Sequence, residues 1–342
     1  MFDCLKGAVI IWVVLSHSFT DVWGINNCTD YSLIWKIQHS TAGVAMGTLL
    51  VISGYGFRPV KNWKGIKAQV KMLLKPILLV YVFAFPVKII VNLISGREPF
   101  YKVLEMAAGF LLGESGYAKF FGIKTETISV FWYFLALFLG WMILSMIFRF
   151  IEKEAVRGAA VLVCGLAGWI GAIIFPNLPY CINPAMLTVG FLYFGYLLKK
   201  KRLLFEKIPF WIYAATVLGT AVTILAGHVN ISAGTMHLGM IDYAGTLCGC
   251  LLVLKIYLMV FDPENKIFVP FMFVGRNTLL FISLHGFECL TAGWGVFTPL
   301  ISSSVHLTAM FFFCARLLLI LLLYYIVNYF RKRLLSRKLT WK

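Results

Sequence analysis

The amino-acid sequence predicts an all-α polytopic membrane protein, on the evidence of its composition and the length of its apolar runs. Of 342 residues, 61% are hydrophobic and 13% are charged, and the mean hydropathy is +0.86. Soluble domains are usually about half apolar and a quarter charged. The excess of apolar residues is collected in runs long enough to cross a bilayer, which requires about 20 mostly apolar residues. We therefore expect one transmembrane domain, residues 1–342, without a separate soluble domain.

About ten transmembrane helices are expected along the chain. The first apolar run lacks the n-region and cleavage site of a signal peptide, so we expect it to remain as a helix. The fifth and sixth runs are short, and Gly275, Arg276 and Asn277 interrupt the start of the ninth. The expected helices cover residues 4–23, 37–57, 74–95, 128–149, 157–175, 184–198, 209–227, 237–260, 268–293 and 307–330.

Basic residues separate these runs in an alternating pattern. The loops near 176–183, 228–236 and 294–305 contain no Lys or Arg. Because basic loops stay on the cytoplasmic side, the pattern predicts cytoplasmic N- and C-termini in a bacterial-type cell membrane. The basic residues are Arg58, Lys61, Lys64, Lys67, Lys71 and Lys75 after the second helix; Arg149, Lys153 and Arg157 after the fourth; Lys199, Lys200, Lys201, Arg202 and Lys207 after the sixth; Lys266 after the eighth; and Arg331, Lys332, Arg333, Arg337, Lys338 and Lys342 after the tenth.

Two further segments have apolar residues at helical spacing. Within the long loop 96–127, the stretch YKVLEMAAGFLL is expected to lie on the membrane or partly re-enter it from the outside. Segment 58–75 carries Trp63, Ile66 and Val70 among basic residues, which predicts an interfacial helix on the cytoplasmic side.

The net charge of +17 does not predict a nucleic-acid partner, because the basic residues cluster between apolar runs, where topology and contact with membrane lipids explain them. The eight cysteines lack a metal-binding spacing, and we expect no metal. Cys28 and Cys181 both fall on the expected outer side, so a disulfide between them is one alternative.

Ionisable residues inside membrane helices are functional candidates by default because they are costly there. His17 lies 11 residues after Lys6, about 16 Å along a helix and about three turns on. Lys6 and His17 therefore point to nearly the same side. His285 is expected at a similar depth in the ninth helix. The other candidates are Asp242, Lys255, Glu288 and Arg316.

Two histidines at matched depth predict a cavity that performs chemistry or moves a polar group, since imidazole takes up a proton near neutral pH. Each histidine can also be a core residue bonded to a neighbouring backbone. Glu288 and Arg316 can be structural partners, Asp242 a helix cap, and Lys255 a side chain that extends to the cytoplasm. The motifs HExxH, GxSxG and Walker A are absent from the sequence.

Four motifs together resemble the acyltransferase 3 family of membrane-bound acyltransferases. Lys6 and His17 are similar to its Arg/Lys-x10-His signature. VISGYGF at 51–57 resembles the Ser-Gly-aromatic close of the family's second span, and FWYFLALF at 131–138 its Trp-Phe-Leu-x-x-Leu-Phe element. VGRNTLLFISLH at 274–285 resembles its Gly-x-x-Ser/Thr-Leu…His segment. The motifs occur in family order over nearly the whole chain.

The resemblance implies transfer of an acyl group, usually acetyl from acetyl-CoA, to a hydroxyl of a carbohydrate, a lipid-linked glycan or another envelope molecule. The motif histidine corresponds to His17 and its basic partner to Lys6. We expect Lys6, Arg58 and Lys61 to hold the CoA phosphates. His17, with His285, is expected to act as general base or to accept the acyl group briefly. The expected cavity residues are Ser53, Tyr55, Trp132 and Asn277.

The sequence also fits other roles for the basic residues and other functions for the protein. Arg58 and Lys61 can serve topology alone. A transporter or flippase for a glycan intermediate or small metabolite also suits ten spans with buried polar groups, although we find no matching pair of broken helices in the sequence. A membrane scaffold is a third reading, which the histidines disfavour.

Overall fold

A computed structural model describes residues 1–25, 33–94, 99–116, 118–120, 123–176, 178–294 and 304–339, and most of these residues are helical. The helices are α1 (Asp3–Ile25), α2 (Leu33–Tyr55), α3 (Trp63–Gln69), α4 (Lys75–Ile94), α5 (Pro99–Leu112), α6 (Trp132–Phe150), α7 (Glu154–Ile174), α8 (Ile182–Lys200), α9 (Phe210–Leu225), α10 (Met240–Val260), α11 (Val269–Arg276), α12 (Thr278–Thr291) and α13 (Val305–Leu339).

Two short antiparallel hairpins complete the described elements. Strands β1 (Ala118–Phe120) and β2 (Ile123–Thr125) follow α5. Strands β3 (Val229–Asn230) and β4 (Thr235–Met236) connect α9 to α10, with Val229 opposite Met236. Single helical turns lie at Val70–Leu74, Ser129–Phe131, Pro179–Cys181 and Lys266–Phe268.

Each expected transmembrane range contains a helix, but not every helix is long enough to span by itself. Within the described residues, seven helices are long and apolar enough to cross a membrane, or eight if the bent pair α11–α12 is one span. Helix α9 and the segment Thr41–Tyr55 of α2 are also apolar, but they are shorter than a typical span. The chain is thus a multi-pass membrane protein by length and composition, while the count of ten spans and the cytoplasmic placement of the termini stay predictions.

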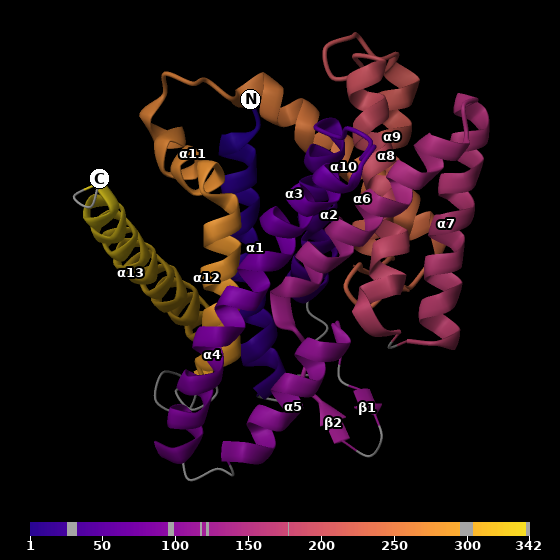
Figure 1. Ribbon diagram of the computed structural model, residues 1–342. Helices are drawn as coiled ribbons and strands as arrows, with labels where there is room; N and C mark the ends of the chain where they lie inside the picture. Colours follow the sequence, from indigo (N-terminus) through magenta and orange to yellow (C-terminus); the bar gives the residue numbers. More distant parts are fainter. Residues whose placement is uncertain are drawn as a thin grey trace.

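Helix α1 lies inside the bundle, packed against α2, α11, α12 and α13 (Figure 1). Helix α8 packs against α2, α6 and α7. Peripheral helices present apolar side chains outward: Phe83 of α4, Ile173 of α7 and Leu318 of α13 are each about two-thirds exposed, at 66%, 65% and 68%. Such surfaces suit contact with lipid tails, because hydrocarbon does not penalise exposed apolar groups.

Glycines let the central helices touch backbone to backbone. A Cβ built on Gly54 would lie 2.1 Å from the carbonyl oxygen of Leu192, and one built on Gly195 would lie 2.1 Å from that of Val51. Gly54 belongs to the VISGYGF motif. The glycine of this motif therefore lets α2 cross close to α8, as small residues do in membrane helix pairs.

The ninth expected helix, 268–293, is broken. Helices α11 and α12 meet at Asn277 with a bend of 74°. The Asn277 side-chain nitrogen donates to the carbonyl oxygen of Phe273 at 2.9 Å. A break is tolerated here because side chains satisfy freed backbone groups. The interruption by Gly275, Arg276 and Asn277 was visible in the sequence, but the direction change was not.

The basic segment 58–75 also differs from expectation. Residues 58–62 are not helical, and α3 continues through a π-helical turn into α4 without a break, so that Trp63–Ile94 is one long apolar candidate span. The segment from Trp63 is therefore continuous with the third span, and its placement at the membrane surface stays a prediction. The expected helix within loop 96–127 is confirmed as α5, which exposes Phe100 and Leu111.

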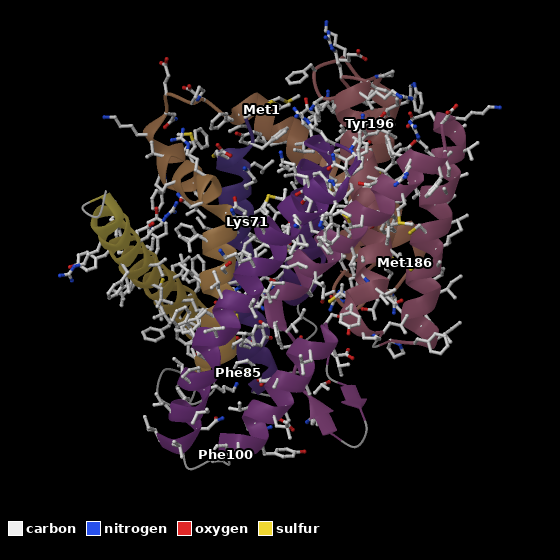
Figure 2. All side chains as sticks on the ribbon, viewed as in Figure 1. Met1, Lys71, Phe85, Phe100, Met186 and Tyr196 are labelled. Atoms are coloured by element: carbon white, nitrogen blue, oxygen red, sulfur yellow. The ribbon has the colours of Figure 1, made fainter. Side chains whose placement is uncertain are left out.

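The bundle has two ends. Figure 2 places Met1 and Tyr196 at the upper end and Phe100 at the lower end. We call these the N-terminal end and the opposite end. Because α1 starts at Asp3 and ends at Ile25, His17 and Asp21 belong to the half of α1 nearer the opposite end.

Candidate active site

Two histidine side chains meet between α1 and α12. The rings of His17 and His285 have centroids 5.2 Å apart with planes at 63°. His285 is buried, with 2% of its surface exposed. Both residues line one cavity of about 210 Å³. The structure therefore brings together the two histidines that sequence depth placed at the same level.

The cavity has a mostly apolar lining with several polar groups. Its polar lining includes Ser16 and Thr20 from α1 and His228, Asn230 and Ser232 from the β3–β4 hairpin. Its apolar lining residues are Ile10, Val13, Ala42, Gly43, Met46, Leu49, Val130, Trp132, Tyr133, Val229, Ile231 and Ile282. Such a site, apolar with a few convergent polar groups, is typical of small-molecule pockets.

A chain of polar side chains extends behind His285. The His285 Nδ1 lies 2.8 Å from Glu288 Oε1, and the Trp294 Nε1 donates to Glu288 Oε2 at 2.6 Å. Glu288 has no exposed surface. Arg316 Nε lies 3.9 Å from Glu288 Oε1, and Arg316 Nη2 donates to the carboxylate of Asp21.

Arg316 is the largest fully buried side chain in the described structure, and its guanidinium stacks 5.2 Å from the Trp294 ring. Its Nε and Nη1 form no hydrogen bond within the described residues. Glu288 and Arg316 are thus ionic partners of each other, as the structural alternative in the sequence analysis expects. Asp21 and Trp294 were missed, although Asp21 stands one helical turn after His17.

The wall beside His17 is tied across two helices. The Gln38 side-chain nitrogen of α2 donates to the Ser16 carbonyl oxygen at 3.1 Å and also to Ser16 Oγ. Both side chains are buried. This link fixes α2 against α1 at the level of His17, and no pattern in the sequence pointed to it.

The β3–β4 hairpin is held by Asp242. Its Oδ2 accepts from the backbone nitrogens of His228 at 3.2 Å and Leu238 at 2.7 Å. Asp242 thus acts as a cap, but on the loop before α10. Burial lowers the pKa of His228 below its ordinary value, with Asp242 opposing the shift. The sequence did not reveal this hairpin as a cavity wall because its strands have two residues each.

Only one of the four expected cavity residues lines the cavity. Trp132 does so. Ser53 lies four residues past Leu49, the last α2 residue of the lining, which is about 6 Å farther along the helix. Tyr55 lies farther still, with its ring 5.2 Å from that of Phe2. Asn277 precedes His285 by about 12 Å of helix rise and sits in the break. These three residues do not line the described cavity, and a role for them in binding stays a prediction.

The three expected phosphate ligands do not line the cavity. Lys6 Nζ pairs with Asp3 Oδ1 at 2.7 Å, and Asp3 Oδ2 lies 4.0 Å from Arg276 Nε. Arg58 and Lys61 are exposed after the end of α2. All three lie toward the N-terminal end of the bundle. Any role they have is at a distance from the histidine pair.

Lys255 differs from the expectation that it extends to solvent. It is buried, and its Nζ donates to the carbonyl oxygen of Glu206 at 2.9 Å. Cys181 is buried with a free thiol that donates to Gly113 O at 3.1 Å. Cys28, its considered disulfide partner, lies outside the described residues.

Metal-ligating atoms gather at one place on α12. Donor atoms of His285, Glu288 and Cys289 lie within 4.8 Å of one another. However, the His285 Nδ1–Glu288 Oε1 distance of 2.8 Å is that of a hydrogen bond, and the fixed positive charge of Arg316 stands 3.9 Å from the same oxygen. The group is therefore hydrogen-bonded and ion-paired within the described residues.

The comparisons with known proteins agree with the family resemblance. A family model described as an acyltransferase domain matches residues 2–332, essentially the whole chain. No curated protein and no solved structure matches it.

Proposed function

The chain belongs to the acyltransferase 3 family, and from this premise we propose that it is an integral-membrane O-acyltransferase. It moves an acyl group, acetyl from acetyl-CoA in the first instance, from the cytoplasmic side to a hydroxyl of a carbohydrate or another cell-envelope acceptor. Acetyl-CoA is a substrate in this reaction, and a carbohydrate acceptor is a free or lipid-linked glycan.

The observation that carries this proposal is the convergence of His17 and His285 on one cavity. A histidine within hydrogen-bonding reach of a bound hydroxyl can remove its proton as the oxygen attacks the thioester carbonyl. Alternatively, His17 accepts the acyl group for a short time and passes it on. The volume of about 210 Å³ suits one small hydroxyl-bearing unit.

The proposed donor site lies toward the N-terminal end. CoA carries phosphates, and Lys6, Arg58 and Lys61 offer charge-assisted hydrogen bonds there. Lys6 stands about 16 Å from His17 along α1, a distance that an extended pantetheine arm can bridge. Phosphate would compete with Asp3 for Lys6, because the two side chains are already paired.

A transporter or flippase for a glycan intermediate or small metabolite is the second candidate, and the broken helix pair α11–α12 favours it. Discontinuous helices often form the substrate sites of transporters. The break at Asn277 lies about 12 Å of helix rise from His285 and does not line the cavity. The break therefore has no role in the proposed transferase site, whereas a transporter could use it as part of a substrate site.

The test is transfer of labelled acetyl from acetyl-CoA to envelope extracts by the purified protein in lipid vesicles. We expect transfer by wild type, loss of transfer in His17→Ala, and wild-type transfer in the control His306→Ala, whose ring lies near Phe19. Wild type that binds no acetyl-CoA and labels no acceptor, yet carries an envelope glycan across the bilayer, would establish the transporter instead. Full transfer by His17→Ala would remove His17 from the mechanism.

A further inference from the structure

The two histidines of the cavity have different surroundings. His285 Nδ1 is hydrogen-bonded to Glu288 Oε1 at 2.8 Å. Because an ionised carboxylate can only accept, the proton of the neutral imidazole lies on Nδ1 and the lone pair on Nε2. No hydrogen bond orients His17 within the described residues. The structure therefore distinguishes an oriented imidazole from one that is packed without such a partner.

We propose that His285 is the general base of the acyl transfer and that Glu288 is its positioning residue. The inference rests on the proposed function and adds a division of labour to it. A carboxylate behind a histidine holds the ring in the correct tautomer and stabilises the imidazolium that forms. His17 then contributes through its contact with the acceptor or the acyl group.

Glu288 is itself held on both oxygens. Trp294 Nε1 donates to Oε2 at 2.6 Å, and Arg316 Nε stands 3.9 Å from Oε1. The carboxylate is completely buried. A group fixed in this way costs no reorganisation when charge develops on its partner, which is the condition for electrostatic preorganisation.

The charges around the His285–Glu288 dyad can stabilise the positive charge that forms on His285 during the reaction. The titratable and charged groups around His285 are His17 and Asp21 from α1, Cys289 and Glu288 from α12, and Arg316 from α13. Lys88 of α4 is near the end of α12, but it donates to Leu290 O at 3.0 Å and Glu126 Oε1 at 3.1 Å. Two carboxylates, Asp21 and Glu288, thus surround one guanidinium, and an added proton on His285 completes the balance.

The step conserves atoms and charge. The acceptor hydroxyl gives its proton to His285 Nε2 while its oxygen forms a bond to the thioester carbonyl carbon. The bond from that carbon to sulfur then breaks, and the CoA thiolate takes the proton from His285. The products are the O-acyl ester and CoA with a free thiol, and the dyad returns to its starting state.

The main variant is Glu288→Gln, which keeps the shape of the side chain and removes its charge. We expect kcat to fall by roughly 100-fold or more, with KM for acetyl-CoA nearly unchanged. Glu105→Gln is the matched control, because Glu105 is also a buried carboxylate but pairs with Lys102 on α5. An equal kcat in Glu288→Gln and wild type would overturn the inference.

A double variant separates positioning from a structural role. If Glu288 acts only through His285, then His285→Ala and His285→Ala/Glu288→Gln have the same kcat, since residues that act as a unit are not additive. Independent losses that multiply would show that Glu288 acts elsewhere and would refute the assignment. Trp294→Phe, which retains an aromatic ring beside Arg316, is a milder variant with an expected loss of roughly tenfold.

Chemical labelling tests the dyad without any acyl transfer. Diethyl pyrocarbonate acylates the free nitrogen of a neutral imidazole, and mass spectrometry reads the rate at each histidine. We expect His285 to react more slowly in Glu288→Gln than in wild type, with His17 little changed. If wild type transfers no acetyl, the proposed function fails, while the labelling rates still decide the dyad: identical rates at His285 in both proteins contradict it.

Discussion

Gly275 of α11 lies directly on the start of α1, so close that a Cβ built on it would stand 1.6 Å from the carbonyl oxygen of Asp3. The contact is mutual, because a Cβ on Gly7 would lie 1.9 Å from the Phe271 carbonyl oxygen. This crossing places the broken pair α11–α12 against α1, and through it His285 beside His17. The motif glycine therefore acts on the site through packing.

Gly275→Ala is expected to destabilise the protein by about 1–3 kcal/mol, the usual cost of overpacking. The backbone of Asp3 cannot give way without moving α1. Thermal unfolding in detergent measures the effect, with Gly56→Ala as control, since the nearest atom to a Cβ there is Ser53 O at 3.4 Å. Equal melting temperatures for the two variants would show that the crossing is loose.

Arg316→Met should be more harmful than its size suggests. The change leaves the fully buried carboxylate of Glu288 and the half-exposed carboxylate of Asp21 without their shared cation. Breaking a buried ion pair on one side costs about 3–5 kcal/mol, and we expect the Glu288 pair to account for most of the loss. Arg276→Gln is the control, because its side chain is 69% exposed. Adding Asp21→Asn to Arg316→Met should restore part of the melting temperature. A double variant less stable than Arg316→Met would contradict the ionic account.

The β3–β4 hairpin should lose stability in acid. Burial lowers the pKa of His228 in the folded protein, whereas the unfolded chain has the ordinary value of about 6.5. The unfolded chain therefore binds more protons in this range, so the contribution of His228 is complete above pH of about 6.5 and is lost as pH falls below it.

Thermal unfolding of wild type and His228→Gln between neutral and mildly acidic pH tests this. The wild type should lose more melting temperature on acidification than the variant. His237→Gln is the control from the same loop, because His237 is exposed. A parallel decline in wild type and His228→Gln would assign the acid sensitivity to other groups.

Lys6→Ala should weaken acetyl-CoA binding by roughly tenfold without a comparable fall in protein abundance, as loss of one charge-assisted contact predicts. Isothermal titration against acetyl-CoA and its dephosphorylated analogue measures the effect. Lys71→Ala is a control with an exposed lysine in the basic segment after α2. Unchanged binding in Lys6→Ala, or an equal loss in Lys71→Ala, would exclude a specific phosphate contact at Lys6.

Much of the fold could be read from local patterns. Helix α1 was expected at 4–23 and runs Asp3–Ile25, and α10 was expected at 237–260 and runs Met240–Val260. The hydropathy of a segment about one span long predicts the position of each membrane helix, because insertion into a bilayer depends on the composition of that segment. The constant rise per residue also allowed the depths of His17 and His285 to be compared.

The cavity wall was less predictable. Ser53 and Tyr55 belong to a motif, and so does Trp132, yet only Trp132 reaches the cavity. A motif does not say which of its residues face a neighbouring helix and which face a void. Gly54 illustrates this, since its function in the structure is to let α2 approach Leu192 of α8.

By itself, the sequence determined that this chain is a multi-pass helical membrane protein with two histidines at one depth, because hydropathy and helical rise are properties of single segments. Only the tertiary structure decided which groups surround those histidines. The bend at Asn277, the pairing of Arg316 with Asp21 and the place of the β3–β4 hairpin in the cavity lining depend on contacts between distant segments. Such contacts form where packing and charge compensation are satisfied together, and no single segment contains that information.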